Sequence, residues 1–188
     1  MIKDTIKKNR SYRRFFAEKA IDTETLVSII DEARFCPCGA NRQRLRVAII
    51  NDEQGKDEIF ATLKFAGYLT EWQGPTMEER PAAYLVLCAE AELDSIMAMD
   101  VGIFAQTLLL SATERGIGGC IFRSYNAARV TEIVSVEGMK PHLVIALGYP
   151  SEKVECVGVK DGDIKYFRGE DDVHYVPKYT ADELIIKK

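Results

Sequence analysis

The sequence contains few of the residues on which most enzymes rely for acid–base chemistry or metal binding. Its 188 residues include two histidines, His142 and His174, which lie far apart along the chain, so a zinc site is not expected. It has no P-loop, no G-x-S-x-G elbow, no H-E-x-x-H pair and no G-x-G-x-x-G segment between a strand and a helix. A chain of this kind suggests a cofactor that supplies its own chemistry.

An excess of positive charge is also missing. The 25 Lys and Arg residues are outnumbered by 29 Asp and Glu residues, which gives a net charge of −4. General nucleic-acid binding needs a basic face, so it is not expected here. The first residues contain no hydrophobic run, and we expect no signal peptide.

The five cysteines are an odd number, and without a secretory signal they predict reduced thiols in the cytoplasm. Cys36 and Cys38 form the only close pair in the sequence. A thiol-redox role for this pair stays open beside the simpler interpretation of a turn that contains two small residues.

One stretch, residues 95–113, is apolar and nearly long enough to span a membrane. It contains Asp100 and Gln106, and no cluster of basic residues or aromatic belt flanks it. We therefore expect a helix that is buried on nearly all sides in the core of a soluble protein or of a dimer.

What the sequence does have is a compact basic segment near its start, NRSYRRF, which spans Asn9–Phe15 and is called the basic knot below. Its three arginines offer rigid forks of donors that match phosphate oxygens, and its serine adds a short donor. Because the whole chain is acidic, the knot indicates a local anion, which we interpret as the phosphate and sugar-alcohol tail of a cofactor. A solvated basic helix end is the alternative.

Two further segments could approach a ligand. The turn Cys36–Asn41 offers backbone donors and the Asn41 amide, and Gln43 follows it. The segment Gly116–Gly119 follows the long apolar helix, and its glycines would let a ligand approach the backbone closely. Gly116 itself stands where a helix usually stops.

The alternation of helical and strand patterns predicts one α/β or α+β domain over residues 1–188. We expect a helix from residue 52 that carries Leu63 and Ala66 on its apolar face, and helices capped by Asp22 and Asn126. Other helices are predicted at 2–8 and 93–115, and buried strands at 45–50, 82–89, 119–122 and 142–147.

Two stretches have no clear core pattern. The polar loop 68–80 either covers a site or packs on the surface. Residues 151–188 are charged and end in an apolar run near Ile185, so this tail is either disordered or packed on something else, such as a second subunit. We expect His174, within the tail, to lie at the surface and His142, at a strand start, to be structural.

The segments NRSYRRF, CPCGANRQ and ERGIGGC, in this order and spacing, resemble the nitroreductase family of FMN-dependent oxidoreductases. The stretches between them also fit the family, and the resemblance covers essentially the whole chain. These stretches are Pro81–Tyr84, Asp100-x-Gly102, Leu147–Pro150, and Val176–Lys178 followed by Leu184–Ile185.

The resemblance implies an α+β, nitroreductase-like fold with a central, mostly antiparallel sheet flanked by helices. It also implies an intertwined homodimer in which residues 151–188 form a C-terminal arm that packs on the partner subunit. Two FMN molecules would lie at the subunit interface. Hydride would pass from NAD(P)H through flavin N5 to a small, planar, electron-poor acceptor such as a nitroaromatic or a quinone.

The resemblance assigns the phosphate end of FMN to the basic knot and to a late lysine. Arg10, Ser11 and Arg13 would hold the phosphate and ribityl chain, and Lys178 would be a further phosphate ligand. Asn9 stands where the family usually has an arginine.

The flavin ring would meet the other two segments. Pro37, Cys38 and Gly39 would line the isoalloxazine from the partner subunit, with Asn41 at the ring edge or ribityl chain and Gln43 nearby. The backbone N–H groups of three residues would lie near flavin N5 and O4, and these are Ile117, Gly118 and Gly119. No residue is nominated as a catalytic acid or base.

Three alternatives remain open at this point. One is an FMN store or sensor without turnover. Another is a thiol-redox protein that uses Cys36 and Cys38. The third is a family relative that catalyses reductive dehalogenation or flavin fragmentation.

Overall fold

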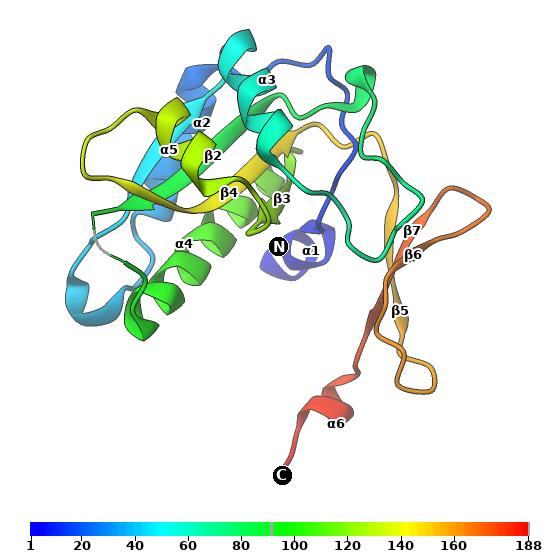
Figure 1. Cartoon of the computed structure of the whole chain (residues 1–188). Helices are drawn as coiled ribbons and strands as arrows, with labels where there is room; N and C mark the ends of the chain where they lie inside the picture. Colours follow the sequence, from blue (N-terminus) through cyan, green and yellow to red (C-terminus); the bar gives the residue numbers. More distant parts are fainter. Residues whose placement is uncertain (91, 188) are drawn as a thin grey trace.

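The computed structural model describes residues 1–90 and 92–187 (Figure 1). The helices in this part of the chain are α1 (Ile2–Lys8), α2 (Thr23–Ala33), α3 (Glu53–Thr62), α4 (Ser95–Glu114), α5 (Ala127–Val134) and α6 (Ala181–Leu184), with short 3-10 helices at η1 (Gly39–Asn41) and η2 (Met77–Glu79). The strands are β1 (Arg46–Ile50), β2 (Ala83–Ala89), β3 (Gly118–Phe122), β4 (Lys140–Gly148), β5 (Val154–Gly158), β6 (Phe167–Arg168) and β7 (His174–Lys178).

A four-stranded antiparallel sheet with strand order β1-β2-β4-β3 forms the centre of the body. Successive residues of the central strand β2 point to opposite faces. Leu85 and Leu87 pack against α2 and α4, whereas Tyr84 and Val86 pack against α3 and α5. Every residue of β2 is buried, because helices cover both faces. The predicted α+β fold, with a central antiparallel sheet flanked by helices, is confirmed.

Two of the predicted elements differ from the structure. The strand predicted as buried at 45–50 is the edge strand β1, and its side chains are mostly half-buried. The helix predicted to carry Leu63 and Ala66 ends at Thr62. It ends early because Lys64 donates its backbone N–H to Ser124 O (2.9 Å), so the chain turns towards the segment before α5.

The long apolar helix α4 begins at the cap Asp94, which accepts a hydrogen bond from the backbone of Met97. By length and composition it could cross a membrane, but one face packs on the sheet and on α2, as in the core helix of a globular protein. The other face carries exposed apolar side chains, with Met99 60% exposed. The expectation of burial on nearly all sides is therefore wrong for the single chain.

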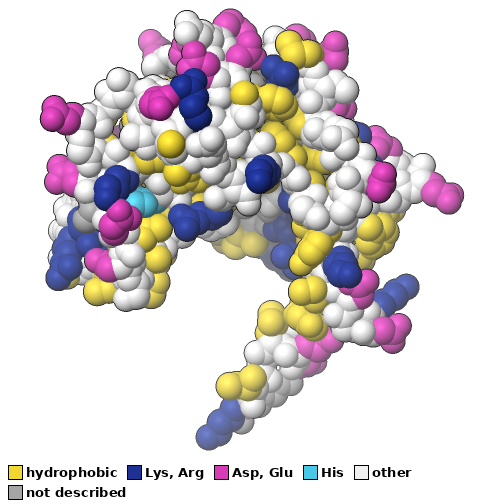
Figure 2. All heavy atoms as spheres, viewed as in Figure 1, with side chains coloured by type: hydrophobic (Ala, Val, Ile, Leu, Met, Phe, Trp, Pro, Cys, Tyr) yellow, Lys and Arg dark blue, Asp and Glu magenta, His cyan; other side chains and the backbone are white. Residues whose placement is uncertain are grey.

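The C-terminal arm, residues 151–187 of the described chain, is ordered as a small sheet with strand order β5-β7-β6. β5 and β7 are parallel, and β6 is antiparallel to β7. The arm stands off the body, with a hollow between the two, and ends in the short helix α6 (Figures 1 and 2). Leu184 and Ile186 are exposed near its end, so the apolar run at the end of the chain finds little cover on its own subunit.

Candidate functional site

The basic knot is fixed to α4 by its first residue. Asn9 is buried, and its amide donates to Leu109 O (3.1 Å) and to Thr113 Oγ1 (3.0 Å). Its side-chain oxygen accepts a hydrogen bond from Gln106 (3.1 Å). Three hydrogen bonds occupy the amide, so Asn9 positions the knot on the body.

The rest of the knot lies along the edge strand β3. Ser11 forms a parallel bridge with Gly119, and Tyr12 donates its backbone N–H to Gly119 O (3.0 Å). Phe15 is fully buried, and a Cβ on Gly148 would come within 2.7 Å of its ring, so only glycine fits there. The knot and the segment Gly116–Gly119, called the glycine turn below, are far apart in sequence but are thus neighbours in the structure.

Four of the predicted site residues line one cavity of about 380 Å³, called the knot cavity below. They are Arg10, Ser11, Arg13 and Lys178. The cavity lies between the knot, α4 and the arm, with Tyr166 and His174 on the arm side. In the described part of the chain, no carboxylate forms an ion pair with Arg10, Arg13 or Lys178. Three unneutralised cations around one cavity are suited to a multiply charged anion such as a phosphate.

The third arginine of the knot has a different role. Arg14 is paired with Asp172 (2.9 Å) and Glu79 (3.4 Å), and it therefore joins the knot to the arm and to η2. This pairing agrees with its absence from the predicted phosphate ligands.

Glu152 holds the backbone of the knot, a role that no pattern in the sequence predicts. Its side chain is 1% exposed and pairs with Arg168 (2.9 Å). The same carboxylate accepts the backbone N–H groups of Arg13 and Arg14. A buried carboxylate with three donors is satisfied, and here it fixes the direction in which the knot side chains leave the chain.

His174 is not at the surface as predicted: it is 1% exposed and lies at the start of β7. Its Nε2 is 3.2 Å from Arg13 Nη1, and its ring packs against Tyr166 with the ring centroids 5.2 Å apart. Burial, and next to it the charge of Arg13, lower the pKa of His174 to about 4. The imidazole is therefore neutral near pH 7 and can accept a hydrogen bond.

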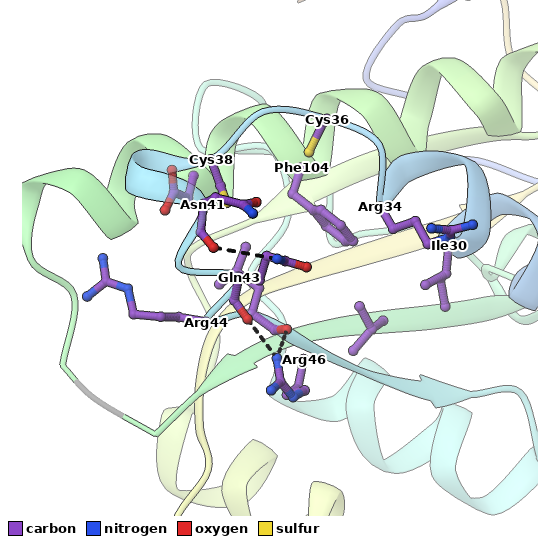
Figure 3. A pocket seen from close by; sticks show the side chains of 12 residues that line it. Ile30, Arg34, Cys36, Cys38, Asn41, Gln43, Arg44, Arg46 and Phe104 are labelled. Carbon is purple, nitrogen blue, oxygen red and sulfur yellow. Dashed lines mark hydrogen bonds between the residues drawn. The ribbon is translucent and has the colours of Figure 1, made fainter.

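The second predicted segment lines a different cavity of about 320 Å³, called the turn cavity below (Figure 3). Cys38, Asn41 and Gln43 contribute to its wall, and Phe104 reaches it from α4. Pro37 is exposed beside this cavity. The lining residues also include four apolar side chains, namely Ile30, Leu45, Val47 and Phe104.

The turn is held against α4 by Gly39. Its backbone N–H donates to Asp100 Oδ1 (2.8 Å), and a Cβ at this position would lie 2.2 Å from Ile96 Cγ2. Only glycine permits this close approach. Asn41 and Gln43 both adopt positive φ (52° and 48°), so the chain reverses sharply and directs their side chains to the same cavity.

The thiols of the turn give no support to a redox pair. All five cysteines are free, and burial raises the pKa of Cys36. A raised pKa lowers the thiolate fraction, which is the reactive form.

The glycine turn connects the end of α4 to the start of β3. Gly116 has φ +73° and ends α4 in a Schellman motif, in which Ile117 donates its backbone N–H to Ala112 O (3.0 Å). The expected presentation of the Ile117 N–H to a ligand is therefore not met, because the helix end already uses it. Gly118 packs under Tyr12, whose ring a Cβ would approach to 2.5 Å.

The comparisons with known proteins identify the family of the chain. The family model described as the nitroreductase family matches residues 6–149, and the chain belongs to this family. The chain is 26% identical over 170 residues to an iodotyrosine deiodinase of Thermotoga neapolitana. The aligned part covers 81% of this chain and 90% of the deiodinase.

Two solved structures show the same fold. An NADPH:FMN oxidoreductase of Vibrio harveyi, determined with NAD⁺, superposes with a TM-score of 0.63 at 26% identity. The aligned part covers 80% of this chain and 69% of the oxidoreductase. A nitroreductase family protein of Streptococcus pneumoniae superposes with a TM-score of 0.73 over 100% of both chains, at 17% identity.

Proposed function

We propose that the chain is an FMN-dependent oxidoreductase that uses NAD(P)H to reduce a small, planar, electron-poor acceptor such as a nitroaromatic or a quinone. The observation that carries the proposal is the convergence of Arg10, Arg13 and Lys178 on one cavity without a carboxylate partner in the described chain. The NADPH:FMN oxidoreductase of Vibrio harveyi, which has the same fold and is 26% identical to this chain where the two align, supports the choice of FMN.

The donor set of the knot cavity fits the phosphate of FMN. Arg10, Arg13 and Lys178 would balance its charge, and the Ser11 hydroxyl would donate to a phosphate or ribityl oxygen. When bound, FMN supplies the ring atom N5 that accepts a hydride and then donates it.

The ring of FMN would lie against a turn cavity, where apolar side chains can cover a planar ring and amides can reach its edge. Pro37, Cys38 and Gly39 would line the ring, and Asn41 and Gln43 would contact its polar edge. Gly118 and Gly119 would bring the backbone close to the ring from the side of the knot. The chain itself binds, orients and excludes water, and we assign none of its side chains a proton-transfer step.

We further propose that each FMN site is shared by two chains of a homodimer. Within one chain the knot cavity and the turn cavity have no lining residue in common, so the turn of the partner subunit would complete the site. Two exposed apolar surfaces would be covered in such a dimer. They are the outer face of α4 with Ile96, Met99 and Ile103, and the end of the arm with Leu184 and Ile186.

Flavin content and its reduction test this function. Purified protein should be yellow, release about one FMN per chain, and lose its colour anaerobically when NADH or NADPH is added. Protein that neither contains nor takes up FMN would contradict the proposal. Protein that binds FMN but is bleached by neither nicotinamide would be a flavin store or sensor.

A second candidate is reductive dehalogenation, which the similarity to the iodotyrosine deiodinase favours. An acceptor panel with nitroaromatics, quinones and iodotyrosine separates the two, because iodide release identifies the dehalogenase. For either activity we propose a cytoplasmic enzyme that needs no metal ion, membrane or nucleic acid.

A further inference from the structure

Arg13 is held in place by two residues of the arm. One of its guanidinium nitrogens lies 3.2 Å from His174 Nε2, and the guanidinium lies 4.8 Å from the centre of the Tyr166 ring. The same nitrogen donates to Ser11 O (3.3 Å). The direction of this cation therefore depends on contacts between segments about 160 residues apart in sequence.

The groups around His174 keep it neutral and set its tautomer. Burial lowers the pKa of the imidazole most, and the charges of Arg13, Arg168 and Arg14 lower it further, whereas the charge of Glu152 raises it. Since Arg13 can only donate, Nε2 must accept, and the ring proton must sit on Nδ1. That atom is buried without a hydrogen-bond partner in the described part of the chain.

A buried donor without a partner is unfavourable, and it calls for a compensating role. A carboxylate at this position would orient Arg13 too, but it would also neutralise the charge. A neutral imidazole orients the guanidinium and leaves its positive charge for a ligand. This difference gives His174 a role that neither an acidic nor an apolar residue could fill.

We propose that His174 is the positioning residue for Arg13, so that docking of β7 on the basic knot is what directs the full charge of Arg13 at a bound phosphate. The inference deepens the proposed function and rests on it, because it takes the phosphate of FMN as the ligand. His174 itself need not touch the cofactor.

The loop 68–80 secures the docked arm. The rings of Tyr68 and Tyr166 lie 4.9 Å apart. The guanidinium carbons of Arg14 and Arg168 lie 5.8 and 5.7 Å from the ring centre of Trp72. The loop therefore contacts Tyr166, which in turn contacts Arg13.

The affinity for FMN relative to riboflavin tests the proposal, because only FMN carries the phosphate. We would measure both dissociation constants by flavin fluorescence for the wild type and for His174→Ala, His174→Gln and His174→Asp. His174→Ala should lower the preference for FMN about tenfold, the loss of one oriented charge-assisted bond. His174→Gln keeps an acceptor and should restore most of the preference, whereas His174→Asp should not.

His142→Gln is the matched control, since His142 is buried on β4 outside the knot cavity, and it should leave the preference unchanged. An unchanged preference in His174→Ala would overturn the proposal. A wild type that binds FMN no better than riboflavin would instead contradict the phosphate site of the proposed function, so the two failures are distinguishable.

Nitrogen-15 NMR of the two histidines gives a second readout that needs no flavin. His174 should be the neutral Nδ1–H tautomer at pH 7, and Arg13→Ala should raise the pKa of His174. The NMR signals of His142 at pH 7 should be the same in both proteins. The Nε2–H tautomer in the wild type would overturn the proposal, because that nitrogen could not then accept from Arg13.

Discussion

The knot cavity and the turn cavity are of similar size but differ in chemistry. The knot cavity, about 380 Å³, is lined by Arg10, Arg13 and Lys178 without carboxylate partners in the described chain. The turn cavity, about 320 Å³, combines apolar side chains with the amides of Asn41 and Gln43. It is also lined by three arginines that have partners in their own chain: Arg34 pairs with Asp31, Arg44 pairs with Asp94, and Arg46 donates to backbone carbonyl groups. An amphipathic ligand with a charged end and a flat apolar end would need both.

Under the proposed function, neither cavity alone would form a complete FMN site. FMN has a phosphate at one end and a largely apolar ring at the other, which is the combination that the two cavities offer. No residue lines both cavities within one chain, and the proposed homodimer would join the two halves across its subunit interface.

Removal of charge from the knot cavity should have the largest effect. Arg10→Ala with Arg13→Ala should weaken FMN binding by about a hundredfold or more, since each charge-assisted bond contributes about 1.5–3 kcal/mol. Riboflavin binding should change little. Fluorescence titration checks both, with Arg129→Ala on the exposed face of α5 as the control. Unchanged FMN affinity in the double variant would refute the phosphate role.

Polar substitution at the end of the arm should have the next largest effect. Leu184→Asp with Ile186→Asp should shift the protein towards monomers, because burial of each apolar side chain contributes about 1.5–3 kcal/mol. The body should stay folded, since both side chains are exposed on their own subunit. Analytical ultracentrifugation measures the shift, with Val136→Asp, also exposed, as the control. A dimer of undiminished stability would exclude the arm from the interface.

A fall in pH should lower the folding stability through His174, and this effect should be smaller than the two above. In the unfolded chain this histidine titrates near its ordinary pKa of about 6.5, and in the folded chain it titrates at about 4. The unfolded state therefore binds the proton first as the pH falls, and folding stability is lost between these values. The loss should be at most about 1.4 kcal/mol per pH unit.

Urea unfolding at pH 7 and pH 5 measures this loss, and His174→Gln removes the titrating group. The fall in stability from pH 7 to pH 5 should therefore be smaller in the variant. An equal fall in both proteins would mean that His174 does not titrate as its surroundings indicate.

The smallest effect is expected in the turn. Cys38→Ser should leave anaerobic flavin reduction unchanged, because the side chain only lines the cavity and the substitution is nearly isosteric. Abolished turnover in this variant, but not in a Cys88→Ser control on β2, would favour the thiol-redox alternative.

Local signals in the sequence predicted much of the fold. Asp22 and Asn126 cap α2 and α5 as expected, and Gly116 ends α4 at a positive φ. The order of strands and helices as far as β4 also follows from short-range patterns, whereas β5, β6, β7 and α6 were not predicted. The end of α3 does not follow from such patterns, because it depends on a hydrogen bond to Ser124 that no local pattern contains.

The candidate site was predictable where its residues lie close in sequence. Arg10, Ser11 and Arg13 share a cavity, whereas Lys178, which lines the same cavity from far along the chain, was predicted only from the resemblance to the family. The roles of Glu152 and His174 were not predicted, because both residues lie in a charged tail and become buried only where the tail docks on the body. The Ile117 N–H was assigned to a ligand because the sequence does not reveal that the Schellman motif uses it.

A mixed dimer tests most directly whether the two cavities of one chain belong to two different FMN sites. One chain would carry Arg10→Ala and Arg13→Ala, and the other Cys38→Trp, which fills the turn cavity. Each homodimer of variants should lose FMN. In the mixed dimer one site receives both defects and the other receives none, so the account predicts one FMN per dimer. Absence of FMN from the mixed dimer, with dimerisation intact, would place each site within a single chain and contradict the account.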